Sequence, residues 1–133
     1  MTRQRFPHPS RWLAALVLLT ALLTGCLPVA DDPGAREKVI EMLRAGQLAT
    51  VEDWRKDYIY LLPPDLDHVS QGGEIAVERL GDSLVVVFFD FRGLNHYTGW
   101  VYSSLAAPVE DPLGNVPFSA IEVAPHWYRV DAG

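Results

Sequence analysis

The chain has 133 residues, enough for one domain of ordinary size, and 49% of them are hydrophobic and 21% charged. This composition excludes an intrinsically disordered chain, and the scattered ten glycines and ten prolines exclude a long coiled coil. The net charge of −6 argues against a nucleic-acid-binding protein, which would carry a basic surface.

Residues 1–25 have the pattern of a secretory signal peptide. Three arginines and no acidic residue occur in the first eleven positions, and an uncharged apolar run follows over residues 12–23. A membrane-spanning helix needs about 20 apolar residues, so this run is short for a retained span. A basic segment followed by a short apolar run is typical of a signal that is removed from the mature protein.

The residues Leu23-Thr24-Gly25-Cys26 at the end of this run resemble the lipobox of bacterial lipoproteins. The resemblance implies that Cys26 is acylated and becomes the first residue of the mature chain. The alternative is an incidental thiol at the end of a signal peptide. With a lipobox, we expect a lipid-anchored, periplasm-facing protein of the bacterial cell envelope, and Leu27 favours the outer membrane where the organism has one.

Cleavage before Cys26 would leave eight basic and seventeen acidic residues, a net charge of −9. Since Cys26 is the only cysteine, the mature domain would contain no disulfide. Residues 26–31 would form a tether of at most about 20 Å, which keeps the domain at residues 32–133 close to the lipid surface. The excess of acidic residues would be repelled by anionic headgroups.

The first element expected in the domain is an amphipathic helix over residues 33–45. Asp32 can cap its free N–H groups, Pro33 suits the first helical position, and Gly46 suits the C-terminal end. Apolar residues recur with helical spacing, and the charged residues between them are assigned to the polar side: Arg36, Glu37, Lys38, Glu41 and Arg44. A helix that packs on its own sheet is favoured over one that binds a partner.

The next segment, residues 50–62, fits either a helix or a strand. We expect a short helical turn at residues 51–55 followed by extended chain, because Pro63-Pro64 ends either element. Residues 65–73 are polar and end in two glycines, so they are expected to form a turn.

Four segments have the pattern of antiparallel strands: residues 74–80, 83–91, 97–103 and 126–130. Gly81-Asp82 between the first two suits a two-residue hairpin turn, which would pair Leu80 with Ser83, Val77 with Val86 and Ile75 with Phe88. The second strand is apolar on both faces, which indicates a position in the middle of a covered or strongly curled sheet. Residues 105–120 form a long proline-rich connection, and residues 121–123 join the last strand as one broken strand or a pair. The predicted fold is α+β, with one N-terminal helix packed on a small antiparallel β-meander.

Residues 90–97 are the strongest candidate for a binding site, because polar side chains gather there at a turn between two strands. The candidate residues are Asp90, Arg92, His96, Tyr97 and Trp100. The alternative is a structural turn in which Asp90 and Arg92 form an ion pair on one strand face and Gly93 takes a positive φ. The aromatic residues of the last strands are expected to fill the core rather than an interface.

No motif in the sequence indicates an enzyme. The phosphate loop, the dinucleotide fingerprint and the zinc-protease motif are absent, and the serines lack the context of a nucleophile. The spacing of His68, His96 and His126 predicts no metal site, and no cofactor is expected. The sequence therefore favours a non-catalytic module that binds an envelope protein partner or supports an assembly. The alternatives are a small-ligand or metal-binding domain centred on residues 90–97 and a small hydrolase.

The domain also resembles small bacterial envelope proteins that share three features. These are an Arg-Gly turn, a strand of the form Tyr-x-Gly-Trp-Val-Tyr and a C-terminal Trp-Tyr strand, found here at residues 92–93, 97–102 and 127–128. The resemblance implies an envelope location and carries no activity.

Overall fold

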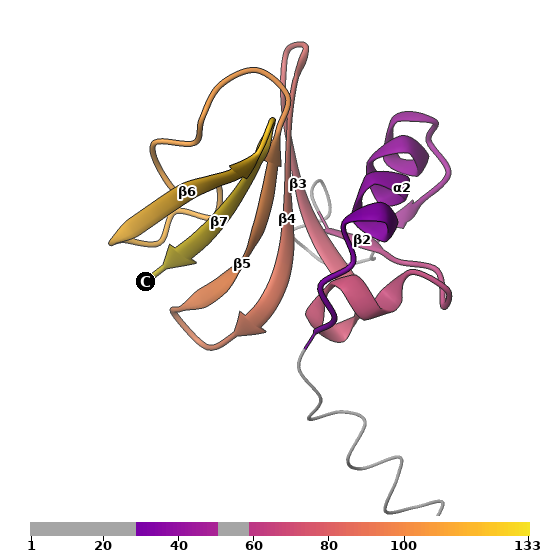
Figure 1. Ribbon diagram of the computed structural model, residues 1–133, viewed down its shortest axis with the longest axis horizontal. Coiled ribbons are helices and arrows are strands. Elements are labelled where there is room, and N and C mark those ends of the chain that lie inside the picture. The colour runs from indigo at the N-terminus through magenta and orange to yellow at the C-terminus, as the bar shows by residue number, and fades with distance from the viewer. Residues whose placement is uncertain (1–28, 51–58) are drawn as a thin grey trace, which may run out of the picture.

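The computed structural model describes residues 29–50 and 59–133. The expected signal peptide, the lipobox with Cys26 and the helical turn at residues 51–55 lie outside the described residues. Within them the chain has an α+β fold, in which one α-helix lies beside a seven-stranded antiparallel sheet (Figure 1).

The sheet has the strand order β1-β2-β3-β4-β5-β7-β6, and all neighbouring strands are antiparallel. Two short 3₁₀ helices, η1 (Asp67–Val69) and η2 (Gln71–Gly73), occupy the turn before β3. The strands are β1 (Ala49–Thr50), β2 (Ile59–Leu61), β3 (Glu74–Leu80), β4 (Ser83–Arg92), β5 (Tyr97–Ser103), β6 (Phe118–Ala124) and β7 (Trp127–Ala132).

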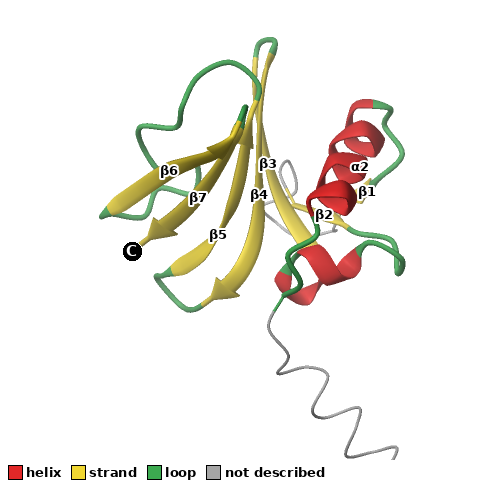
Figure 2. Cartoon of the chain, in the orientation of Figure 1, coloured by secondary structure: helices red, strands yellow, loops and turns green. Residues whose placement is uncertain are grey.

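The expectation of a simple β-meander is wrong at the C-terminal half of the sheet. After β5 the connection at residues 104–117 carries the chain to the outer edge, where it forms β6. The chain then turns back and inserts β7 between β5 and β6 (Figure 2). Strand β6 is also longer than the three residues expected at 121–123. It pairs with β7, so the two last segments form a strand pair rather than one broken strand.

Helix α2 (Pro33–Arg44) begins and ends where the sequence predicts, to within one residue. The Asp32 carboxylate accepts a hydrogen bond from the Ala35 N–H at 3.1 Å. At the other end Gly46 has φ +68°, its N–H donates to the Leu43 carbonyl at 3.2 Å, and the Gln47 N–H donates to the Met42 carbonyl at 2.9 Å. This pair of bonds closes the helix in the arrangement known as a Schellman motif.

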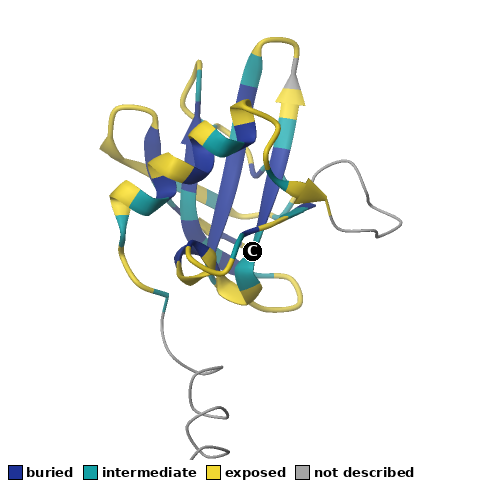
Figure 3. Ribbon diagram, turned by 90° about the vertical axis from the view of Figure 1, so that its right-hand side faces the viewer, coloured by how far each residue is buried: buried dark blue, intermediate teal, exposed yellow. Residues whose placement is uncertain are grey.

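The centre of the sheet is buried on both faces, in agreement with the two-sided apolar pattern of β4. Helix α2 lies over one face of the sheet (Figure 3). Three of its buried residues pack against the sheet and the 3₁₀ region on that face. The buried residues of this cluster are Val39, Ile40, Leu43, Leu62, Leu66, Val69, Ile75, Val77, Leu84, Val86, Phe88, Tyr102 and Trp127. The opposite face carries a second cluster, made of Ile59, Ala76, Val87, Phe89, Tyr97, Val101, Tyr128, Val130 and Ala132.

The β3–β4 hairpin has the predicted register, with Leu80 opposite Ser83, Val77 opposite Val86 and Ile75 opposite Phe88. Gly81 has φ +60° and Asp82 does not have a positive φ. A positive φ at only the first central residue is the pattern of a type II′ turn, which matches the twist of the two strands.

A β-bulge at Asp90 interrupts the pairing of β4 with β5. Phe89 lies opposite Gly99 and Phe91 lies opposite Thr98, so one residue of β4 has no counterpart. Beyond a bulge of this kind the side chains of a strand exchange faces. The expected Asp90–Arg92 ion pair is therefore wrong, because the bulge places the two side chains on opposite faces of the sheet. The expected positive φ of Gly93 is wrong as well.

Next to the bulge, a close approach of the β4 and β5 backbones requires a glycine at position 99. A Cβ atom at this position would lie 2.0 Å from the Phe88 carbonyl oxygen, so the two strand backbones would have to separate. We expect Gly99→Ala to lower the free energy of unfolding by about 3 kcal/mol or more, as in severe overpacking. Chemical denaturation followed by tryptophan fluorescence would measure the loss.

Gly93→Ala is the matched control in the adjoining turn. A Cβ there would lie 3.4 Å from the His96 carbonyl oxygen and from the exposed ring of Phe91, which can move aside. Its cost should stay within about 1 kcal/mol. Equal losses for the two variants would contradict this account of the bulge.

Candidate functional site

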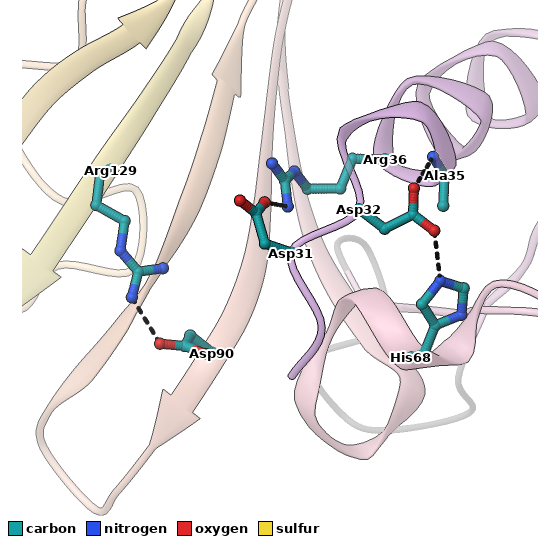
Figure 4. Close-up of polar contacts among 7 residues, drawn as sticks. All are labelled: Asp31, Asp32, Ala35, Arg36, His68, Asp90 and Arg129. Atoms are coloured by element: carbon teal, nitrogen blue, oxygen red, sulfur yellow. Dashed lines mark hydrogen bonds and ion pairs between the residues drawn. The ribbon is translucent and has the colours of Figure 1, made fainter. Parts of the chain in front are cut away.

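The five candidate residues of the sequence do not form one site, because the sheet separates them. Asp90 and Trp100 lie on the face toward α2, where both contact Arg129 of β7. The Arg129 Nη2 donates to Asp90 Oδ2 at 2.6 Å (Figure 4). Its guanidinium carbon lies 4.2 Å from the centre of the Trp100 ring. Arg129 thus replaces Arg92 as the partner of Asp90.

Arg92 and Tyr97 lie on the opposite face. The Arg92 guanidinium is 4.7 Å from the centre of the Phe89 ring, and its nearest carboxylate is Glu74, at 3.8 Å. His96 is half-exposed at the end of the sheet, where its Nε2 lies 3.0 Å from Asp131 Oδ1. None of these contacts brings Arg92, His96 and Tyr97 together around a common space.

Tyr97 has a structural role in the second core cluster. Its buried ring packs edge-on against Phe89 with ring centres 5.4 Å apart, and its hydroxyl donates a hydrogen bond to Asp111 Oδ1. Burial, followed by the hydrogen bond with Asp111, raises the pKa of the Tyr97 hydroxyl well above its usual range. The phenol therefore stays protonated and acts as a donor.

Asp111 organises the long connection between β5 and β6. Its carboxylate also accepts hydrogen bonds from the backbone N–H groups of Leu113 at 3.0 Å and Asn115 at 2.7 Å. Sequence analysis missed this residue, although Asp followed by Pro and then Gly-Asn is a turn signal in which the aspartate commonly binds nearby backbone N–H groups. The Tyr97–Asp111 bond fixes the connection to the sheet, and Leu113 packs against the second cluster.

The segment that precedes α2 is held to the domain by two side-chain contacts, Asp31 with Arg36 and Asp32 with His68 (Figure 4). Asp32, besides capping the helix, lies 2.9 Å from His68 Nε2 of η1. The hydrogen bond from His68, followed by the one from the Ala35 N–H, lowers the pKa of the Asp32 carboxyl below 3.8. Asp31 accepts a hydrogen bond from Arg36 Nη1 at 2.9 Å.

Arg36 is the residue for which the sequence interpretation fails most clearly. The sequence pattern predicts that Arg36 lies on the polar side of the helix, yet its side chain is only 7% exposed. The guanidinium carbon lies 4.4 Å from the centre of the Trp100 ring and 5.5 Å from that of Trp127. Planar guanidinium groups stack well on aromatic rings, which explains how an arginine replaces an apolar residue at this position.

A cavity of about 340 Å³ lies where α2 approaches the β6–β7 hairpin. Helix-side residues contribute its charged groups, and strand residues contribute most of its apolar wall. The residues that line it are Asp31, Pro33, Arg36, Glu37, Trp100, Val123, Ala124 and Trp127. Glu37 Oε1 accepts a hydrogen bond from Trp127 Nε1 at 2.7 Å, so this carboxylate positions the indole that forms the cavity wall.

Strand β6 borders the cavity and forms one edge of the sheet. Every residue of β6 is exposed or half-buried, and the side chains of Ile121 and Val123 are 70% and 57% exposed. Glu122 is the only charged residue on the strand. Among the described residues, the backbone of β6 pairs with β7 alone.

Three further observations bear on function. No group of three or more His, Cys, Asp or Glu residues within 29–50 and 59–133 could hold a metal ion. None of the helices described is both long enough and apolar enough to cross a membrane. Comparison of the chain with models of known families, with curated proteins and with solved structures finds no match.

Tyr97→Phe tests the structural role of the Tyr97 hydroxyl. The substitution removes one of the donors of a buried carboxylate, and such a loss costs about 1–3 kcal/mol of unfolding free energy. Tyr128→Phe is the matched control, since Tyr128 lies in the same cluster and its hydroxyl makes no hydrogen bond with any described residue. Urea denaturation of both variants would measure the difference, and equal stabilities would show that the Tyr97–Asp111 bond contributes nothing.

Proposed function

We propose that this chain is a lipoprotein of the bacterial cell envelope whose domain is a non-catalytic module that binds an envelope protein partner. The lipobox-like residues ending at Cys26 support the lipid anchor and the periplasm-facing location, and Leu27 supports the outer membrane where one exists. In the mature chain, which would begin at Cys26, α2 would be the N-terminal helix on the sheet.

The observation that carries the binding role is the exposed edge of β6. Proteins usually protect such edges with several charges, a proline within the strand or a covering segment, because an open edge pairs readily with another chain. Here seven residues form an edge with one charge and two exposed apolar side chains, Ile121 and Val123. An edge of this kind is suited to the addition of an extended segment from a partner.

In the proposed complex the partner strand makes main-chain hydrogen bonds with β6. Its side chains on the α2-facing side would contact Ile121, which lies opposite Arg129 of β7 on that face. Pro117 and Pro125 flank the strand and limit the paired segment to the residues between them. The short tether would present this edge near the membrane, where envelope partners are anchored or inserted.

Ile121→Lys should abolish partner binding, because a charge on the open edge prevents addition of a strand while the folded domain is unaffected. In intact cells, a photo-crosslinking amino acid at Ser119 of β6 should yield a defined crosslinked product. Ile121→Lys should reduce this product at least tenfold with little change in melting temperature.

Leu94→Lys is the matched control, since Leu94 is an equally apolar and fully exposed residue in the β4–β5 turn. It should leave the Ser119 product unchanged, and a crosslinker placed at Leu94 itself should give no such product. A product that survives Ile121→Lys, or that Leu94→Lys removes equally, would contradict docking at β6.

The lipid anchor has its own test. Intact mass of the protein from the membrane fraction should correspond to a chain that begins at Cys26 and carries a diacylglycerol group. Cys26→Ser should stop both processing and anchoring, because the thiol is the site of attachment. Detection of an unmodified full-length chain in the membrane fraction, or normal anchoring of Cys26→Ser, would refute the proposal.

A further inference from the structure

We infer that the cavity between α2 and the β6–β7 hairpin binds a carboxylate attached to an apolar group, with Arg36 as the residue that receives the carboxylate. This inference goes beyond the docking of a partner strand on β6. It depends on Arg36 and Asp31, which are not part of that strand, so either proposal can fail without the other.

Arg36 has the chemistry of a carboxylate receptor. A guanidinium group presents its N–H donors in a plane that matches the two oxygens of a carboxylate, and such pairs are strongest where water is excluded. The Arg36 side chain is nine-tenths buried and is fixed in orientation by its contacts with Trp100 and Trp127. Its Nε is buried and has no hydrogen-bond partner in the described part of the chain.

The carboxylate that contacts Arg36 in the structure comes from a residue that can leave. Asp31 makes a single hydrogen bond to Arg36 Nη1, and 71% of its side chain is exposed. Asp31 also precedes the helix, so its withdrawal would break no helical hydrogen bond and would expose little apolar surface. We interpret Asp31 as an internal occupant that an incoming carboxylate displaces.

The other cavity walls suit an apolar group. Pro33, Trp100, Val123, Ala124 and Trp127 provide them, and the volume of about 340 Å³ lies at the small end of the range for ligand pockets. Glu37 is hydrogen-bonded to Trp127 and adds negative charge at the rim. A ligand with a second negative charge would be repelled there, so the preferred ligand is a monocarboxylate.

Two sources supply this chemistry, a free apolar carboxylic acid and the C-terminal residue of a polypeptide. Because Trp100 and Trp127 line the cavity, binding of either should change the intrinsic fluorescence. The purified full-length protein would be titrated with hexanoate and with the peptide N-acetyl-Ala-Ala-Val-Leu, each alongside the corresponding amide. The acid that saturates at the lower concentration identifies the source, and the amides should bind at least tenfold more weakly.

Variants assign the binding to Arg36 and Asp31. Asp31→Asn removes the competing charge and should tighten binding of the acid at least threefold, whereas Arg36→Gln should weaken it at least tenfold. Arg129→Gln is the matched control, because Arg129 also lies against Trp100 but does not line the cavity. Both Arg129→Gln and Ile121→Lys should leave the affinity for the acid within twofold of that of the unsubstituted protein.

If Arg36→Gln fails to fold, Asp31→Asn and the comparison of acid with amide still decide the question. Absence of saturable binding by both acids would overturn the inference. Equal binding of acid and amide, or unchanged affinity of Asp31→Asn, would overturn it as well.

Discussion

The fold depends on one constraint, which is that β4 is apolar on both of its faces. Val86 and Phe88 point to one side and Val87 and Phe89 to the other, and all four are almost fully buried. A strand of this kind is stable only when both faces of the sheet are covered. Helix α2 covers the first face (Figure 3). Leu113 of the β5–β6 connection, which the Tyr97–Asp111 bond fixes, packs on the second face together with residues of β6.

The sequence predicts those elements whose signals lie close together in the chain. The helix, the β3–β4 hairpin and its register follow from signals within about twenty residues: a capping aspartate, a proline, two glycines and regular apolar spacing. The bulge at Asp90 leaves no such local signal. It arises where β4 meets β5, and it redistributes the predicted site residues between the two faces of the sheet.

The sequence interpretation also fails at β6 and at Arg36, and in both cases because residues distant in sequence determine the structure. Strand β6 has seven residues but exposes most of them, so its sequence lacks the buried alternation by which strands are recognised. Arg36 follows the rule that charged residues face solvent, yet two tryptophans distant in sequence provide aromatic surfaces for its guanidinium group. Both positions depend on the partners that the fold brings together, and both border the cavity between α2 and the β6–β7 hairpin.

The position of β7 has a consequence for the order in which the sheet can assemble. This strand comes last in sequence but lies between β5 and β6, and it supplies Trp127 and Tyr128 to the two core clusters. During synthesis, β6 therefore has no neighbour in the sheet until β7, residues 127–132, has emerged. Until then the apolar residues of β6 and the open edge of β5 are exposed, and exposed strands of this kind are prone to aggregate.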